Sequence, residues 1–184
     1  MERQKKFVNY VRQYARRTNG DVHYTNNSLG RVSLYIDKSF MRVVFPFYNA
    51  NEMILFEGFT PRKNRGRGHQ KLLRAIAIKA AQVAGYKRVT QFGENKEKLN
   101  PKGLPPSTIL MRKIFKFKPE NNHSGFKTSA RQINPIKNNA KRLRRNTAVN
   151  EILTREAVRR GVRRVLSASP PRTRRTPSRP KSVS

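Results

Sequence analysis

The feature that most constrains this fold is a glycine-containing turn between an apolar run and an alanine-rich segment. The apolar run, residues 53–59, has the composition of a strand, and residues 65–68 (Arg-Gly-Arg-Gly) follow it after a short basic stretch. Leu73, Ala77 and Ala81 then recur at intervals of four, which places them on one face of a helix. The sequence therefore predicts a strand that turns through glycines into a helix, as in folds that layer helices on a sheet.

This turn predicts an anion-binding site. The first N–H groups of a helix have no partner within the helix, and the helix dipole places partial positive charge beside them. Together they form a ready site for a pyrophosphate. Four cations in and before the turn add long-range attraction: Arg62, Lys63, Arg65 and Arg67. The alternative interpretation is an ordinary basic loop that faces solvent, because Gly-X-Gly alone is a common pattern.

The turn and its flanks resemble the acyl-CoA-binding motif of the GNAT-type N-acetyltransferases. In that family an Arg/Gln-x-x-Gly-x-Gly/Ala turn follows the fourth strand, and the next helix ends at a glycine before the fifth strand. Arg65, Gly68 and Gln70 occupy the three motif positions here, and Gly85 precedes the strand-like segment 87–89. The resemblance is good over residues 52–92, extends in part to residue 118 and is absent beyond.

The resemblance implies an α/β fold with a mixed, mostly antiparallel sheet flanked by helices, and acetyl-CoA as the cofactor. Backbone amides of the turn would hold the pyrophosphate of that coenzyme. The residues expected to contact it are Phe59, Arg65, Gly66, Arg67, Gly68, His69, Gln70 and Asn95. Gln70 stands where glycine or alanine is usual, and its side chain would crowd a phosphate unless it points away. The alternative for His69 is a plain polar residue at the start of the helix.

Two carboxylates are candidates for a general base. Histone-acetylating members of the family place a glutamate near the start of the fourth strand, where Glu52 stands in this chain, and Glu57 lies near the end of the same run. Either could take a proton from an ammonium substrate, directly or through water. The alternative is that Glu52 is an ordinary turn residue. The resemblance also implies that a backbone amide near residues 56–58 polarises the thioester carbonyl. Met111 stands where the family often has a tyrosine acid, and it cannot donate a proton.

The charge of the chain indicates a polyanionic partner. Its 184 residues contain 42 lysines and arginines against 10 acids, a formal net charge of +32. Nucleic acid is the expected partner, because each neutralised phosphate releases condensed counterions, and an anionic membrane surface is the lesser alternative. The absence of cysteine excludes disulfides, thiolate catalysis and cysteine zinc sites. His23, His69 and His123 lack the spacing of metal ligands, so no metal site is expected.

No targeting segment or membrane span is expected. No apolar run approaches the roughly 20 residues that a membrane-spanning helix needs. The basic start of the chain lacks the apolar core of a secretory signal. The sequence therefore predicts an intracellular protein that does not enter a membrane and that resides in a nucleus, a nucleoid or a virion core.

The segments before the glycine turn show the patterns of one helix and three strands. Helical spacing joins Phe7, Tyr10, Val11 and Tyr14. Strands are expected at residues 30–36, 40–48 and 53–59. Short turns would join these strands into an antiparallel meander. The first strand of the family would be missing or reduced to residues 22–24.

Behind the glycine turn, the fourth strand, the helix and a fifth strand at residues 87–89 are expected to form a parallel crossover. A further helix is expected at residues 107–117, after an insertion at 97–106 that is rich in lysine and proline. These elements would complete an acyl-CoA-binding domain over residues 1–120.

The C-terminal third of the chain is basic and low in aliphatic residues. Residues 121–184 hold 17 lysines and arginines against two acids, a balance of +15. We expect a basic linker at 121–146, an amphipathic helix at 147–166 and a disordered Ser/Pro/Arg tail at 167–184. The helix could pack on the domain, contact a partner or form only on nucleic acid. The alternative for the tail is a merely solubilising role.

The cations of this C-terminal third are expected to contact phosphates without reading bases. They are Lys141, Arg142, Arg144, Arg145, Arg159, Arg160, Arg163, Arg164, Arg172, Arg174 and Arg175. Residues 141–145 also have the composition of a nuclear import signal.

Three functions remain open at this point. The first is an acetyl-CoA-dependent N-acetyltransferase that acts on a protein lysine or another amine and is brought to its substrate by the basic arms. The second is a catalytically degenerate GNAT-fold protein that packages or scaffolds nucleic acid, which Gln70 and Met111 favour. The third is a ribosome-like structural protein with an incidental resemblance.

Overall fold

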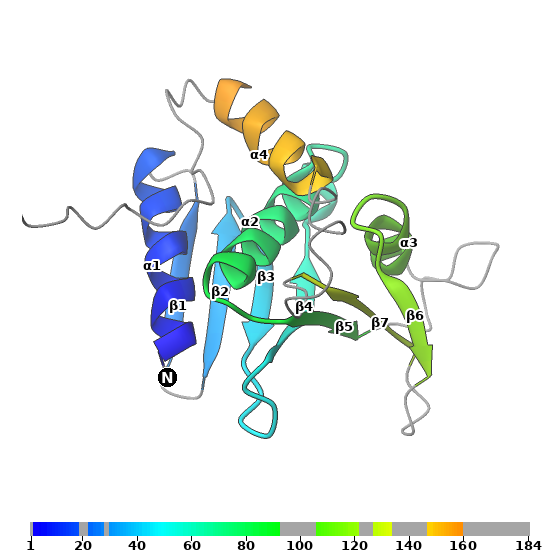
Figure 1. The fold of residues 1–184 in the computed structure, drawn as a ribbon. Coiled ribbons are helices and arrows are strands. Elements are labelled where there is room, and N and C mark those ends of the chain that lie inside the picture. The colour runs from blue at the N-terminus through cyan, green and yellow to red at the C-terminus, as the bar shows by residue number, and fades with distance from the viewer. Residues whose placement is uncertain are drawn as a thin grey trace, which may run out of the picture.

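The chain forms a mixed sheet with helices packed against it (Figure 1). The computed structural model describes residues 2–18, 22–27, 30–92, 106–121, 127–133 and 147–159. Its strands are β1 (His23–Asn27), β2 (Arg31–Ile36), β3 (Ser39–Val44), β4 (Glu52–Phe59), β5 (Arg88–Phe92), β6 (Lys118–Asn121) and β7 (Lys127–Gln132). Its helices are α1 (Glu2–Arg17), the 3-10 helix η1 (Arg62–Asn64), α2 (His69–Val83), α3 (Pro106–Lys113) and α4 (Thr147–Arg159).

The strands of this sheet follow the order β1-β2-β3-β4-β5-β7-β6. β4 and β5 are parallel and are joined through α2, as predicted for the crossover. The other neighbouring strands of the described sheet are antiparallel. The predicted α/β class, with a mostly antiparallel sheet flanked by helices, is therefore confirmed.

Helix α1 forms because its apolar residues share one face. The residues of that face are all buried: Phe7, Tyr10, Val11 and Tyr14. The helix ends at Arg17, and the backbone N–H and side-chain hydroxyl of the following Thr18 both donate to the carbonyl of Tyr14. α1 packs against α2 and β1, so the N-terminal helix belongs to the same core as the glycine turn.

Strands β1 to β4 form the predicted antiparallel meander. β2 and β3 pair along their full length. β3 is shorter than predicted and ends at Val44, because Pro46 has no N–H for a ladder and the N–H of Asn49 donates to the carbonyl of Pro46 in a turn. β1 covers five residues, so the first strand is longer than the sequence indicated.

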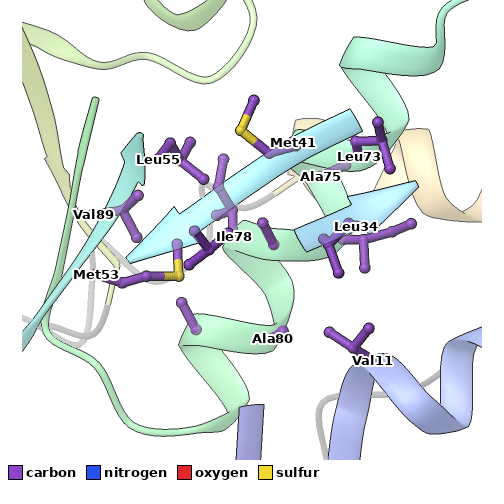
Figure 2. Packing of buried hydrophobic residues seen from close by; sticks show 14 of the residues in the cluster. Val11, Leu34, Met41, Met53, Leu55, Leu73, Ala75, Ile78, Ala80 and Val89 are labelled. Atoms are coloured by element: carbon purple, nitrogen blue, oxygen red, sulfur yellow. The ribbon is translucent and has the colours of Figure 1, made fainter. Parts of the chain in front are cut away.

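The core lies between the sheet and α2 (Figure 2). Buried side chains come to this interface from four adjacent strands: Leu34, Met41, Met53, Leu55 and Val89. Residues 72–81 of α2 are buried on all sides, because the sheet, α1 and α4 surround this helix. Its many alanines allow the surrounding elements to approach closely.

The sheet extends beyond the predicted domain boundary. Residues 127–132, which fall within the predicted linker, form β7 between β5 and β6. The segment is polar and lacks the apolar alternation that identifies a strand, so pairing on both of its edges defines it. The side chain of Ile133 is buried and its N–H donates to the carbonyl of Lys87. The folded domain therefore reaches at least residue 133.

Helix α3 ends earlier than the segment predicted at residues 107–117, whereas α4 is described as far as Arg159 and the predicted residues 160–166 lie outside the described residues. α3 ends at Lys113, and Lys116 has a positive φ of 56°, which takes the backbone out of the helical region. α4 packs on α2 through Val149, Ile152 and Leu153, which is the first of the three alternatives for this segment. No helix in the described ranges is long and apolar enough to cross a membrane.

Candidate functional site

A fork between β4 and β5 is the first component of the site. The two parallel strands pair from Glu52↔Arg88 to Leu55↔Gln91, and the described ladder between them stops there. Beyond the fork β4 continues beside β3 as far as Phe59, whereas β5 continues beside β7. One edge of residues 56–59 is therefore left outside the described ladder, and such an edge can accept hydrogen bonds from an extended ligand.

A β-bulge lies at the fork. Val43 pairs with Leu55 and Arg42 pairs with Glu57, so Phe56 is an extra residue on β4. Past this bulge Gly58 faces α2. A Cβ at Gly58 would lie 2.7 Å from Gln70 Oε1 and 2.7 Å from Met41 Cε, so a larger residue would force these side chains to shift.

The glycine turn is the second component. Gly66 has a φ of 79° and Gly68 a φ of 78°, both in the left-handed region that favours glycine. A Cβ at either position would meet no described residue within 4 Å, so the described part of the chain leaves the space over the turn open. α2 begins at His69, with no side-chain cap and no acidic residue in its first turn. The first amides of α2 therefore present the positive end of the helix dipole to this open space.

A pocket of about 330 Å³ adjoins the turn. It is lined by Gly66, Arg67, Gly68, Lys71, Leu72, Ile114, Glu151, Ile152, Arg155 and Glu156. The side chains that the turn and α2 contribute are two cations and one apolar residue, whereas α4 contributes two carboxylates, a guanidinium and the apolar Ile152. The volume of the pocket and the amides of the turn fit a pyrophosphate group. The carboxylates of α4 place negative charge beside that group.

The side chain of Gln70 points away from the open space over the turn. Its Nε2 donates to the carbonyl of Phe40 at 2.8 Å and to the carbonyl of Phe59 at 2.7 Å. The side chain of Gln70 therefore does not crowd a phosphate bound over the turn. His69 also points away: its Nδ1 lies 3.0 Å from the hydroxyl of Ser39, and the imidazole is buried. Only the backbone of these two residues faces the candidate site.

A buried arginine lies beneath the end of β4. Arg74 is 4% exposed, and its Nη1 donates to Gln70 Oε1 at 2.5 Å. Burial lowers the pKa of Arg74 to about 10, so the guanidinium stays charged at neutral pH. Its Nε is buried without a hydrogen-bond partner. This positive charge adds to the attraction for an anion near Gly58 and the start of α2.

The two candidate bases occupy different parts of β4. Glu52 lies at the first β4–β5 pair, is 12% exposed and forms an ion pair with Arg88 at 3.3 Å. It also accepts hydrogen bonds from Thr90 and Asn49. Glu57 lies two residues beyond the fork, is 37% exposed and pairs with Arg42 at 2.6 Å. Of the two carboxylates, Glu57 alone is on the part of β4 that does not pair with β5.

Met111 is fully buried in the core rather than at the fork. Its carbonyl accepts a hydrogen bond from the N–H of Phe117, which lies just after the end of α3. The residue at the expected tyrosine position thus serves packing, and it offers no proton donor.

Many of the predicted contacts lie outside the described residues. These are Asn95, Lys141, Arg142, Arg144, Arg145, Arg160, Arg163, Arg164, Arg172, Arg174 and Arg175. Arg159 is the last residue of α4, and only its backbone is described. Phe59 is the last residue of β4 and is 50% exposed, with its ring 5.8 Å from the ring of Phe40. The structure thus brings together the fork, residues 65–68 and the first turn of α2.

Sequence reasoning missed several residues that line or support this site. Lys71 and Arg74 could have been found, because Lys71 lies in the first turn of the predicted helix and Arg74 lies one turn after Gln70. The contribution of Glu151 and Arg155 had no local signal, since it depends on a contact between segments about 80 residues apart.

Comparison with known proteins adds similarity of fold and nothing more. No protein-family model and no curated protein sequence matches the chain. An acetyltransferase from Thermus thermophilus is 15% identical over 55% of this chain and 62% of its own, with a TM-score of 0.39. The PaiA N-acetyltransferase from Thermoplasma acidophilum in complex with coenzyme A is 13% identical over 70% of each chain, with a TM-score of 0.40.

The ribosomal-protein-S18-alanine N-acetyltransferase from Escherichia coli is also similar. It is 11% identical over 70% of this chain and 79% of its own, with a TM-score of 0.43. The chain thus spans 62% of the length of the Thermus protein and more of the other two. At such low identities and TM-scores these likenesses carry no weight for activity or substrate, which must be argued from the fork and the glycine turn.

Proposed function

We propose that this protein binds an acyl-coenzyme A, with acetyl-CoA the first candidate, and transfers the acyl group to an amine. The observation that carries the proposal is the junction of the β4–β5 fork with the open glycine turn at the start of α2. The turn suits a pyrophosphate, and the free edge of residues 56–59 suits an extended arm that bears amides.

In this proposal Glu57 is the general base. It lies on the part of β4 that is free of β5, and it is more exposed than Glu52. An amine acceptor arrives as an ammonium ion and must lose a proton before it can attack an acyl group. Glu52 is held by Arg88, Thr90 and Asn49, so its role is to fix the first β4–β5 pair. Acetyl-CoA, when bound, supplies the activated thioester.

A second candidate function is nucleic-acid packaging or scaffolding by a catalytically degenerate fold. The formal net charge of +32 favours it, because a coenzyme alone cannot account for so many cations. The arginine partners of both candidate bases and the buried Met111 also favour it. In that case the glycine turn would be a structural feature without a coenzyme-binding role, and acetyl-CoA would bind no better than any polyanion.

Calorimetric titration of acetyl-CoA into the full chain, freed of nucleic acid at high salt, separates the two functions. We expect one-to-one binding with a dissociation constant on the order of micromolar. Gly68→Asp should abolish binding, because it places a carboxylate in the open space over the turn. The matched control is Gly85→Asp, since Gly85 has a φ of 84° and also meets nothing within 4 Å, but lies at the other end of α2.

The backbone strain and the added charge are the same in both variants, so only the position differs. Loss of binding in Gly68→Asp with binding kept in Gly85→Asp supports the coenzyme site. Equal heats from inorganic pyrophosphate or heparin, or equal losses in both variants, would contradict it.

A further inference from the structure

A row of rings crosses the sheet at the end that carries the glycine turn. The cross-strand pairs His23↔Tyr35, Tyr35↔Phe40 and Phe40↔Phe59 link four adjacent strands. Residues directly opposite each other in antiparallel strands project to the same face. Leu34 and Met41, which alternate with these residues along β2 and β3, point into the core. The four residues, which we call the ring row, therefore project from the opposite face of the sheet.

The three aromatic rings on β2, β3 and β4 are close together, and the row is accessible. The centroids of Tyr35 and Phe40 are 6.2 Å apart, and those of Phe40 and Phe59 are 5.8 Å apart. Tyr35 and Phe40 are half-buried, His23 is exposed and Phe59 is 50% exposed. Cross-strand packing explains why aromatic residues stabilise this meander. It does not explain why the row stays open to solvent at both of its ends.

Charged groups border the ring row. The guanidinium of Arg42 lies 5.6 Å from the centre of the Phe40 ring and also pairs with Glu57. Lys38 lies exposed in the turn between β2 and β3, beside Asp37, whose carboxylate is 3.8 Å from His69. Arg62 and Lys63 are exposed just after the end of β4. Cations thus outnumber acids around the row, as they do in the whole chain.

We propose that the ring row is a stacking platform for the unpaired bases of a single-stranded nucleic acid. Aromatic side chains on an open sheet accept bases face to face, and neighbouring cations contact the phosphates. A duplex hides the faces of its bases, so stacking of this kind selects single strands. The net charge of +32 favours a polyanion over a protein as the occupant of this apolar surface. Phe59 belongs both to this row and to the free edge of β4, whereas the other three residues of the row lie outside the pocket over the glycine turn. Base stacking on the row does not depend on acyl transfer.

Binding measurements with the full chain test the proposal. The probes are a labelled oligothymidylate of about 12 nucleotides and a duplex of the same length. An ionic strength of about 0.5 M screens most of the sequence-independent attraction to surface cations. Tyr35→Leu and Phe59→Leu keep an apolar side chain and remove the ring. Each should weaken binding to the single strand between about fivefold and about 150-fold, with duplex binding unchanged.

The matched control is Phe47→Leu, because Phe47 is an aromatic residue that is 99% exposed in the loop between β3 and β4, away from the row. This control should bind the single strand like wild type. Photo-crosslinking with bromodeoxyuridine in the oligonucleotide should label peptides that contain Tyr35 or Phe59. Circular dichroism melting shows whether each variant is folded.

Three results would overturn the proposal. The first is an equal loss for duplex and single strand in a folded ring-row variant. The second is an equal loss in Phe47→Leu, and the third is crosslinking confined to residues 134–184. A change in self-association in the ring-row variants, with nucleic-acid binding unchanged, would assign the surface to a protein partner instead.

Discussion

The carboxamide of Gln70 joins the ends of two strands to the start of α2. Its Nε2 donates to the carbonyls of Phe40 and Phe59, and its Oε1 accepts from the buried Arg74. A glycine or an alanine at this position would leave both carbonyls and the guanidinium without these bonds. The residue that departs from the family pattern therefore stabilises the backbone on which the candidate site depends.

We predict that Gln70→Gly destabilises the fold and does not improve coenzyme binding. Loss of two hydrogen bonds to carbonyls, together with the backbone entropy of glycine, should lower the free energy of unfolding by about 2–3 kcal/mol. Urea unfolding measures this change, and calorimetry measures the affinity for acetyl-CoA. A variant with unchanged stability and tighter coenzyme binding would show that Gln70 does crowd the site.

The two glutamates of β4 should behave differently when their charge is removed. Glu57→Gln should lower the rate of amine acetylation by about 10²- to 10⁴-fold with coenzyme affinity kept, because it removes the base and not the anion site. Glu52→Gln should instead lower the free energy of unfolding by about 1–3 kcal/mol, since it removes the partner of Arg88. Initial rates of amine acetylation and urea unfolding are both measured for each of the two variants. A rate loss confined to Glu52→Gln would transfer the role of base to that residue.

Tyr86 gives a pH-dependent test of the core. Burial raises the pKa of its hydroxyl from 10.0 to about 12, so the phenol resists ionisation in the folded chain more than in the unfolded chain. Stability should therefore fall as the pH rises from about 10 to about 12, because the unfolded state gains from ionisation first. The difference in unfolding free energy between wild type and Tyr86→Phe should change in this window. A constant difference would mean that Tyr86 is not buried as described.

At the scale of elements, the parts with a strong local pattern were predictable from the sequence. The apolar stripe from Phe7 to Tyr14 predicted α1, and three apolar runs predicted β2 to β4 and their antiparallel meander. The order of strand, turn and helix predicted the parallel crossover through α2. By contrast, β7 is polar and is defined by two neighbouring strands. The fork and the packing of α4 on α2 arise from contacts between segments that are distant in the sequence, and such contacts leave no periodic pattern in it.

Helix α4 should modulate the candidate anion site. Glu151 and Glu156 line the pocket opposite Arg67 and Lys71, so they repel a pyrophosphate. The double variant Glu151→Gln/Glu156→Gln should bind acetyl-CoA about tenfold more tightly at low salt, and the gain should shrink as salt screens the charges. Glu2→Gln, an exposed change at the start of α1, is the control. Unchanged or weaker binding in the double variant would mean that these carboxylates do not face the bound anion.

At the scale of the whole molecule, the positive charge is spread over both the folded domain and the segment that follows α4. The folded domain includes β7 and the packed α4, so a test of the basic tail must keep residues 1–159. Removal of residues 160–184 takes away eight lysines and arginines. The slope of log affinity for duplex DNA against log salt should then become shallower by about 0.9 for each phosphate that the shortened chain no longer neutralises. Fluorescence anisotropy measures the slope, and an unchanged slope would exclude the tail from phosphate binding.

Hydrogen–deuterium exchange of the full chain, with and without acetyl-CoA, tests whether the free edge of β4 and the glycine turn hold one ligand between them. We predict slower exchange on addition of acetyl-CoA at the backbone amides of residues 56–59 and 66–71, with β1 and β2 unaffected as an internal control. Protection that is absent, or that falls only on the basic segment after residue 133, would contradict a coenzyme site at the fork.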